Sequence, residues 1–186
     1  MAGRVARNTR LTASTGAALF ALLALEGVTI LFVRPLLSLH EFVGMLLVPP
    51  IALKLGSTGW RFTRYYLGDP DYVRAGPPPL LLRLTAPILV LATLFVFATG
   101  VAMLALGPRS HGLIGLHKAS FVVWFAATAV HVLGHIRSVP ALVRGSGRTQ
   151  RRLVVAAVVV GLAAAAATAS LIHPWTTWAA HQREHE

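Results

Sequence analysis

Five long apolar stretches constrain the fold of this chain more than any other feature of its sequence. Each has roughly the 20 apolar residues that a helix needs to cross about 30 Å of hydrocarbon. They cover residues 13–33, 37–55, 80–106, 112–135 and 153–173. The chain is 55% hydrophobic with only 12% charged residues, which is too apolar for an ordinary soluble domain. We therefore predict an all-α fold, a membrane-spanning helical bundle with a four-helix core and a fifth transmembrane helix.

The basic residues predict how the chain is oriented in the membrane. Short loops rich in Lys and Arg stay on the cytoplasmic side. Alternate sides of the five spans hold thirteen basic residues against four, the four being Arg34, Arg109, Lys118 and Arg183. The sequence thus predicts a multi-pass protein of the cell inner (plasma) membrane, with its N-terminus cytoplasmic and its C-terminus extracytoplasmic. The first apolar run ends without a small-residue cleavage motif, so we expect an uncleaved anchor.

The loops between the spans predict how the chain is divided. Short outer connections require antiparallel neighbours among the first four spans, whereas a later loop with glycines and five arginines is typical of a flexible linker. The predicted segments are a basic cytoplasmic N-terminal segment (1–12), a four-helix core (13–136), a basic cytoplasmic linker (137–152), the fifth transmembrane helix (153–174) and an outer tail (175–186). In the fifth helix Gly161, Ala165 and Ala169 recur every four residues, a pattern that lets helices approach closely.

The net charge and the absence of cysteine exclude several classes of function. A formal net charge of +11 would suit nucleic-acid binding if the basic residues lay together on one folded domain. Here they lie in short loops beside the membrane. There it sets topology and contacts anionic lipid, so we expect membrane lipid and no nucleic acid among the partners. With no cysteine in the chain, disulfides, thiolate chemistry and cysteine-ligated iron–sulfur clusters are excluded. A redox centre would have to use His, Lys or Met.

Two pairs of basic side chains repeat one spacing inside the apolar stretches. His117 and His131 lie fourteen residues apart, as do His40 and Lys54. Fourteen residues make almost four helical turns, so each pair faces one side of its helix about 21 Å apart. Both helices run from outside to inside, which puts His40 and His117 at one outer depth and Lys54 and His131 at one inner depth. Ionisable groups inside a membrane are costly and usually line a functional interior.

Small residues stand at matching depths on the two flanking spans. Gly27 and Gly100 lie near the depth of His40 and His117, and alanines precede each glycine by fourteen residues. A haem between two facing helices needs one axial ligand from each, and small residues where the porphyrin edge meets a flanking backbone. With these residues, positions 11–137 resemble the transmembrane cytochrome b superfamily, namely the four-helix haem-binding core of bc-complex cytochrome b and related small bacterial cytochrome b membrane proteins.

The resemblance implies a set of haem-binding residues. His40 and His117 match the axial ligands of an outer haem b, and His131 matches an inner ligand. Gly27 and Gly100 match the glycines that make room for the outer haem. The departure is Lys54, which stands where the family has a histidine. A neutral lysine amine can ligate iron and an ammonium cannot, so we expect one haem b, and a second inner haem only if Lys54 acts as a ligand.

Each candidate also has an alternative interpretation. His40 and His117 could be interfacial side chains bonded to loops, and His135 is either another inner ligand or a residue that extends to the interface. Lys54 could be a charge that sets topology or the partner of a haem propionate. Glu26, the one carboxylate well within a span, could relay protons, touch a quinone or pair with Lys118, and we favour pairing.

Basic groups near the outer site suit a charged ligand. Arg34 and Arg109, together with His111 and Lys118, surround the predicted site, and arginine in particular matches the two propionates of a haem. His181 and His185 have helical metal-ligand spacing but no third ligand in the sequence, so we assign them to the surface tail.

Three functions follow from these residues. The first is a membrane-bound b-type cytochrome that transfers single electrons between a quinone pool or membrane partner and an outer redox partner, such as an extracytoplasmic oxidoreductase. Such a protein is more readily an electron-transfer subunit of an oxidoreductase than a stand-alone enzyme. The second is a cofactor-free transporter or assembly subunit with an intramembrane His/Glu proton path. The third is a catalytic haem reductase, which would need its reductant from another subunit because the chain has no nucleotide-binding glycine pattern.

Overall fold

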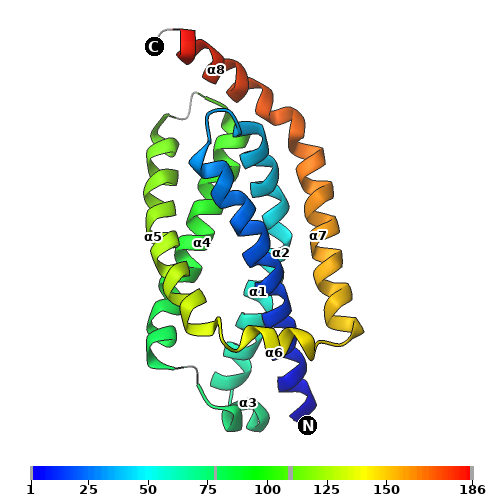
Figure 1. Cartoon of the computed structure of the whole chain (residues 1–186). Helices are drawn as coiled ribbons and strands as arrows, with labels where there is room; N and C mark the ends of the chain where they lie inside the picture. Colours follow the sequence, from blue (N-terminus) through cyan, green and yellow to red (C-terminus); the bar gives the residue numbers. More distant parts are fainter. Residues whose placement is uncertain (1, 78, 109–110, 185–186) are drawn as a thin grey trace.

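The computed structural model describes residues 2–77, 79–108 and 111–184, with side chains for 3–77, 79–108 and 112–178. Every regular element in these residues is a helix (Figure 1). The long helices are α1 (Ala2–Leu31), α2 (Leu37–Tyr66), α4 (Leu80–Leu106), α5 (His111–His135) and α7 (Arg148–Thr168). The short ones are α3 (Pro70–Ala75), α6 (Val139–Arg144), the 3₁₀ helix η1 (Ala169–Ile172) and α8 (His173–Glu184). Among the described residues, five helices are long and apolar enough to cross a membrane. The predictions of an all-α fold and of five candidate membrane-spanning helices are therefore confirmed.

The first two membrane helices are longer than their apolar stretches. α1 begins at Ala2 rather than at residue 13, and α2 continues to Tyr66 rather than ending at residue 55. Hydropathy marks only the part of a helix that suits lipid, whereas backbone hydrogen bonding continues until a residue interrupts it. Pro49 and Pro50 lie inside α2 without ending it, as membrane helices tolerate when neighbouring groups compensate. α2 instead ends just before Gly68, whose φ of 78° is left-handed.

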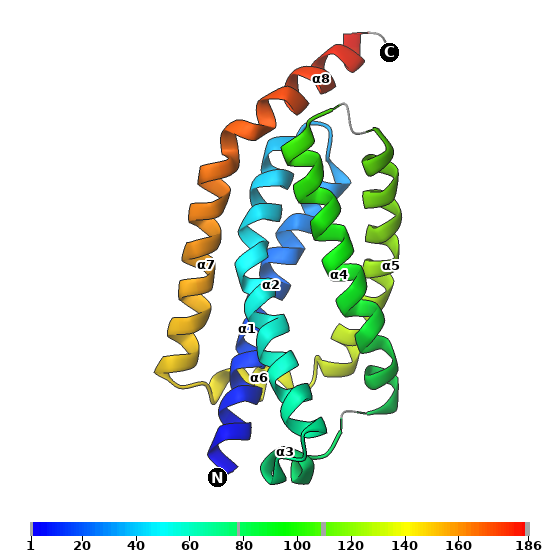
Figure 2. The same cartoon turned by 180° about the vertical axis from the view of Figure 1, so that it is seen from behind.

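The bundle consists of two antiparallel hairpins and one added helix. α1 packs along α2 and α4 packs along α5, while α7 packs on the far side of α2 (Figure 2). The hairpins meet chiefly where α2 approaches α4, and among the described residues α5 packs extensively against α4 alone. We call the end with residues 32–36 and Gly107 the outer end, and the end with α3 and α6 the inner end. The two termini lie at opposite ends of the bundle (Figure 1).

Small residues let α7 approach α2 closely. Gly161 and Ala165 are both buried, and a β-carbon on Gly161 would collide with the backbone carbonyl of Leu46. The predicted close approach is therefore confirmed at these two positions. Ala169 is exposed, and α7 has given way there to η1.

The predicted flexible linker and outer tail are both partly helical. Within residues 137–152, α6 packs against α1, and the hydroxyls of Ser14 and Ser146 lie 2.6 Å apart. The segment is thus partly helical and is joined to α1 through Ser146, whereas its flexibility stays a prediction. In the tail, α8 extends from His173 to Glu184. Trp175 is buried and its indole N–H donates to the Met103 carbonyl at 3.1 Å, which joins α8 to the end of α4.

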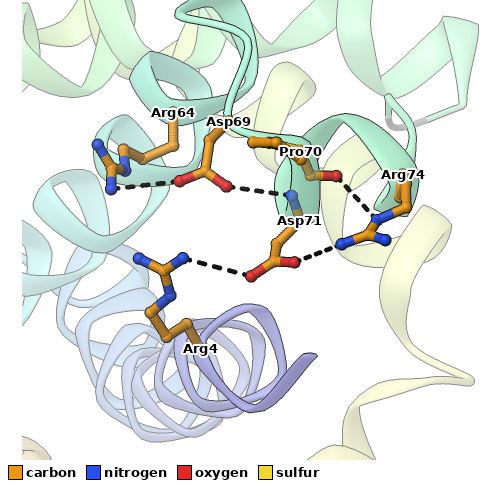
Figure 3. A network of polar contacts seen from close by, with 6 residues as sticks. All are labelled: Arg4, Arg64, Asp69, Pro70, Asp71 and Arg74. Atoms are coloured by element: carbon orange, nitrogen blue, oxygen red, sulfur yellow. Dashed lines mark hydrogen bonds and ion pairs between the residues drawn. The ribbon is translucent and has the colours of Figure 1, made fainter. Parts of the chain in front are cut away.

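An ion-pair network joins α1, α2 and α3 at the inner end (Figure 3). Asp69 caps α3 by accepting from the Asp71 backbone N–H at 3.1 Å, and Arg64 lies 3.2 Å from its other oxygen. Asp71 accepts from Arg74 at 2.7 Å and from Arg4 at 3.4 Å. Burial raises the pKa of Asp71, but hydrogen bonds from Arg74 and Arg4 and their charges outweigh it and hold the pKa below its usual value. The inner loop is thus tied to the start of α1.

Candidate haem-binding site

His40 and His117 lie close together at the outer end of the bundle. His40 is near the start of α2 and His117 is on α5, so the two rings come from different hairpins. Their ring centres are 6.4 Å apart and their planes meet at 77°. Both side chains are partly buried. The structure therefore brings together the two imidazoles that the sequence placed at one depth.

Each ring is held through its Nδ1 atom. Nδ1 of His40 lies 2.8 Å from an oxygen of Glu26 and 3.1 Å from the hydroxyl of Thr29. Nδ1 of His117 lies 3.0 Å from the hydroxyl of Thr99. Metal-bound histidines commonly have one nitrogen oriented by a carboxylate, hydroxyl or carbonyl, which leaves the other for the metal. With Nδ1 occupied, Nε2 of each ring is the nitrogen left for coordination.

The two histidines are supported by matching threonines. Thr29 on α1 is fully buried and donates to the Glu26 backbone carbonyl at 2.7 Å. Thr99 on α4 is buried and donates to the carbonyl of Val96 at 3.0 Å. In both cases a hydroxyl on one helix of a hairpin fixes an imidazole on the other. Sequence reasoning missed both threonines, although each lies within two residues of a predicted glycine.

The two predicted glycines differ in what they face. A β-carbon at position 100 would lie 3.3 Å from Cε1 of His117, which is a tight contact. Gly100 therefore provides room for the His117 ring itself. A β-carbon at Gly27 would meet nothing within 4 Å. The role of Gly27 beside a porphyrin edge stays a prediction.

The inner pair is arranged differently. Nζ of Lys54 donates to the Thr12 carbonyl of α1 at 2.7 Å, and a β-carbon on Gly16 would lie 3.0 Å from the same atom. The ring of His131 lies 4.8 Å from that of His135, and its buried Nδ1 has no hydrogen-bond partner. Lys54 is thus engaged by α1, whereas His131 contacts a residue of its own helix.

Glu26 has a different partner from the one that the sequence favoured. It is 8% exposed and pairs with His40, whereas Lys118 is exposed on α5. Glu26 is therefore paired with a basic side chain, as predicted, but the partner is His40 rather than Lys118. A carboxylate reaches a base one helix away more readily than one on another hairpin, and His40 is on the adjoining helix. Glu41, which follows His40, is a second partly buried acid that sequence reasoning passed over.

The remaining predicted residues lie around the outer end or beyond the described part. Arg34 is exposed in the turn between α1 and α2. Arg109, predicted to face a propionate, lies outside the described residues. The side chains of His111, His181 and His185 lie outside them too.

The geometry of His40 and His117 can be compared with what one iron requires. An imidazole nitrogen binds a transition metal at about 2.0 Å and lies about 1.1 Å from its ring centre, so two imidazoles on opposite sides of one iron have centres roughly 6.2 Å apart. The observed 6.4 Å fits this separation. No group of three or more His, Cys, Asp or Glu side chains suited to a metal ion occurs in the described residues. A haem needs only two ligands from the protein, because the porphyrin supplies the other four.

Comparison with known proteins adds no further information about the chain. No protein family, curated protein or solved structure matches it. Any function must therefore be argued from the geometry of its own residues.

Proposed function

We propose that this protein is a membrane-bound b-type cytochrome of the plasma membrane, in which His40 and His117 hold one haem b at the outer end. The observation that carries the proposal is the 6.4 Å separation of two imidazoles from different hairpins, each oriented through Nδ1. When bound, the haem would supply one-electron oxidation and reduction. The chain supplies two ligands, fixes their orientation and surrounds them with apolar helices.

We propose a single haem because the inner residues fit one poorly. The Lys54 amine already donates to Thr12, and an ammonium has no lone pair for iron. His131 alone would leave an inner iron with one protein ligand. This supports the interpretation of Lys54 as a basic inner-end residue rather than an iron ligand.

The position of the site suggests how electrons would enter and leave. His40 is the fourth residue of α2 and His117 the seventh of α5, so both lie within two turns of the outer end. The basic loops assign this end to the extracytoplasmic side. We therefore propose single-electron exchange between a quinone or membrane redox partner and an outer-face partner such as an extracytoplasmic oxidoreductase. Arg34, exposed in the outer turn, suits a propionate or the acidic surface of such a partner.

The test is the haem content of the purified full-length protein. We expect an absorption spectrum with visible haem bands that sharpen on dithionite reduction, and one haem per chain in a pyridine haemochrome assay. Two haems per chain would contradict the interpretation of Lys54 as a basic residue that does not ligate iron. A folded but colourless protein, after expression with ample haem, would reject the cytochrome.

A second candidate function rests on the buried Glu26–His40 pair. A carboxylate 2.8 Å from an imidazole within a membrane helix bundle is also what a cofactor-free proton path requires. The ring separation of His40 and His117 also lies within the range of an ordinary aromatic contact. This alternative is a transporter or assembly subunit, and the same absorption spectrum separates it from the cytochrome.

A further inference from the structure

Glu26 is a carboxylate placed directly on one of the two proposed ligands. It is buried in α1, and both of its oxygens are engaged. Oε1 lies 2.8 Å from Nδ1 of His40, and Oε2 accepts from the Thr29 hydroxyl at 3.0 Å. A membrane-buried acid is expensive to keep, so its contact with a single ring points to a purpose at that ring.

The other proposed ligand has no carboxylate in contact with its ring among the described residues. Nδ1 of His117 lies 3.0 Å from the Thr99 hydroxyl. The two hairpins therefore share the threonine and differ in the carboxylate. Both rings have a threonine hydroxyl beside Nδ1, whereas the direct contact with a carboxylate is found at His40.

We infer, on the basis of the proposed function, that Glu26 is a positioning residue for His40 whose charge lowers the reduction potential of the haem iron. A carboxylate that accepts from Nδ1–H makes the imidazole a stronger electron donor. Its negative charge, acting through a poorly polarisable interior, also favours the more positive ferric state. The couple concerned takes up one electron, which the titrant supplies, and no proton transfer or bond cleavage is required.

The chain offers a matched control for this charge. Glu41 adjoins His40 on α2, is also partly buried, and its Oε2 has no hydrogen-bond partner. Glu41→Gln thus replaces a carboxyl group next to the same ligand without removing a hydrogen bond to a ring. Comparing Glu26→Gln with Glu41→Gln separates the carboxylate in contact with His40 from a neighbouring carboxyl group that lacks this contact.

The experiment is a redox titration of the purified, haem-loaded full-length protein and the two variants. We expect Glu26→Gln to keep its haem and to favour reduction at least tenfold, a rise of about 59 mV for a one-electron couple. We expect a smaller change for Glu41→Gln. Equal shifts in the two variants, or a haem-loaded Glu26→Gln at the wild-type potential, would overturn the inference.

A second variant covers the case in which Glu26→Gln fails to retain haem. Thr29→Val removes the hydroxyl that lies 3.0 Å from Oε2 of Glu26 and 3.1 Å from Nδ1 of His40. Oε1 of Glu26 then remains as the described partner of Nδ1, and the carboxylate, having lost its own donor, becomes a stronger acceptor. The potential should then fall below that of the wild type, and an unchanged or raised potential would reject the role of Glu26. A colourless wild-type protein would instead reject the proposed function itself, so the two failures are distinguishable.

Discussion

At the outer end of the bundle His40 and His117 face each other from two hairpins, whereas at the inner end Lys54 turns to α1 and His131 lies against His135. On both α2 and α5, two basic residues lie fourteen positions apart, one near the outer end and one near the inner end. Spacing alone therefore does not make a ligand pair. The outer rings each have a supporting group on the neighbouring helix, while the inner amine has its own acceptor and the inner imidazole has none.

The largest expected effect comes from removing an outer ligand. His117→Ala should lose all haem while remaining inserted, because the apolar spans that direct insertion are unchanged. His131→Ala should keep the wild-type haem content. A pyridine haemochrome assay on both purified proteins measures the difference. Haem retained in His117→Ala, or lost in His131→Ala, would reverse the assignment of the two ends.

A smaller effect is expected from crowding the His117 ring. In Gly100→Val the new β-carbon alone would lie 3.3 Å from Cε1 of His117, so the ring must shift to admit the two methyl groups. Overpacking of this kind costs about 1–3 kcal/mol, which corresponds to at least a roughly fivefold loss of haem affinity. Gly115→Val is the control, since nothing lies within 4 Å of that position. Titration of haem into the apoprotein measures the haem affinity of both variants. Equal affinities would show that Gly100 is not needed to make room for the His117 ring.

The inner lysine should have little influence on the haem. Lys54→Met removes the donor to the Thr12 carbonyl and keeps a similar side-chain length. We expect unchanged haem content and spectrum, and a change in stability of about 1 kcal/mol, the typical net contribution of one hydrogen bond. Thermal unfolding in detergent with a parallel absorption spectrum measures both. A loss of haem would show that the inner end takes part in binding.

The smallest expected effect is a pH dependence at the inner end. The pKa of Asp71 is lowered in the folded protein, so its ionised form stabilises the fold at pH values above the ordinary value of about 3.9. This stabilisation is lost as the pH falls through the lowered folded pKa. Asp71→Asn should therefore melt below the wild type at neutral pH, with a gap that closes in strong acid. A gap that widens on acidification would contradict the network, and the haem content should be the same in both proteins.

Local sequence patterns predicted the features that depend on one helix at a time. The five spans follow from hydropathy, and the small residues Gly161 and Ala165 predicted a face that another helix could approach closely. The shared depth of His40 and His117 follows from the direction of their helices. The sequence can predict these features because each depends on a single helix and its position in the membrane.

Features that depend on the register between helices could not be predicted in the same way. Nothing in the sequence around Thr29 and Thr99 distinguishes them from other threonines of membrane helices. Their role is visible only from their contacts with the rings of His40 and His117. Lys54 has the right position along α2, yet its amine is bonded to a carbonyl of α1. The choice of His40 over Lys118 as the partner of Glu26 also depends on which helices adjoin. The packing of α6 against α1 and the bond from Trp175 of α8 to the Met103 carbonyl of α4 also join segments that are far apart in the sequence.

The most direct test of the account is an electron paramagnetic resonance spectrum of the oxidised, purified protein. If His40 and His117 ligate one iron, the spectrum should show a single low-spin ferric haem. Its strongly anisotropic form should match imidazole planes that are nearly perpendicular, as the 77° angle indicates. A high-spin signal, which reports an iron lacking one of the two imidazoles, or two distinct low-spin signals would contradict it.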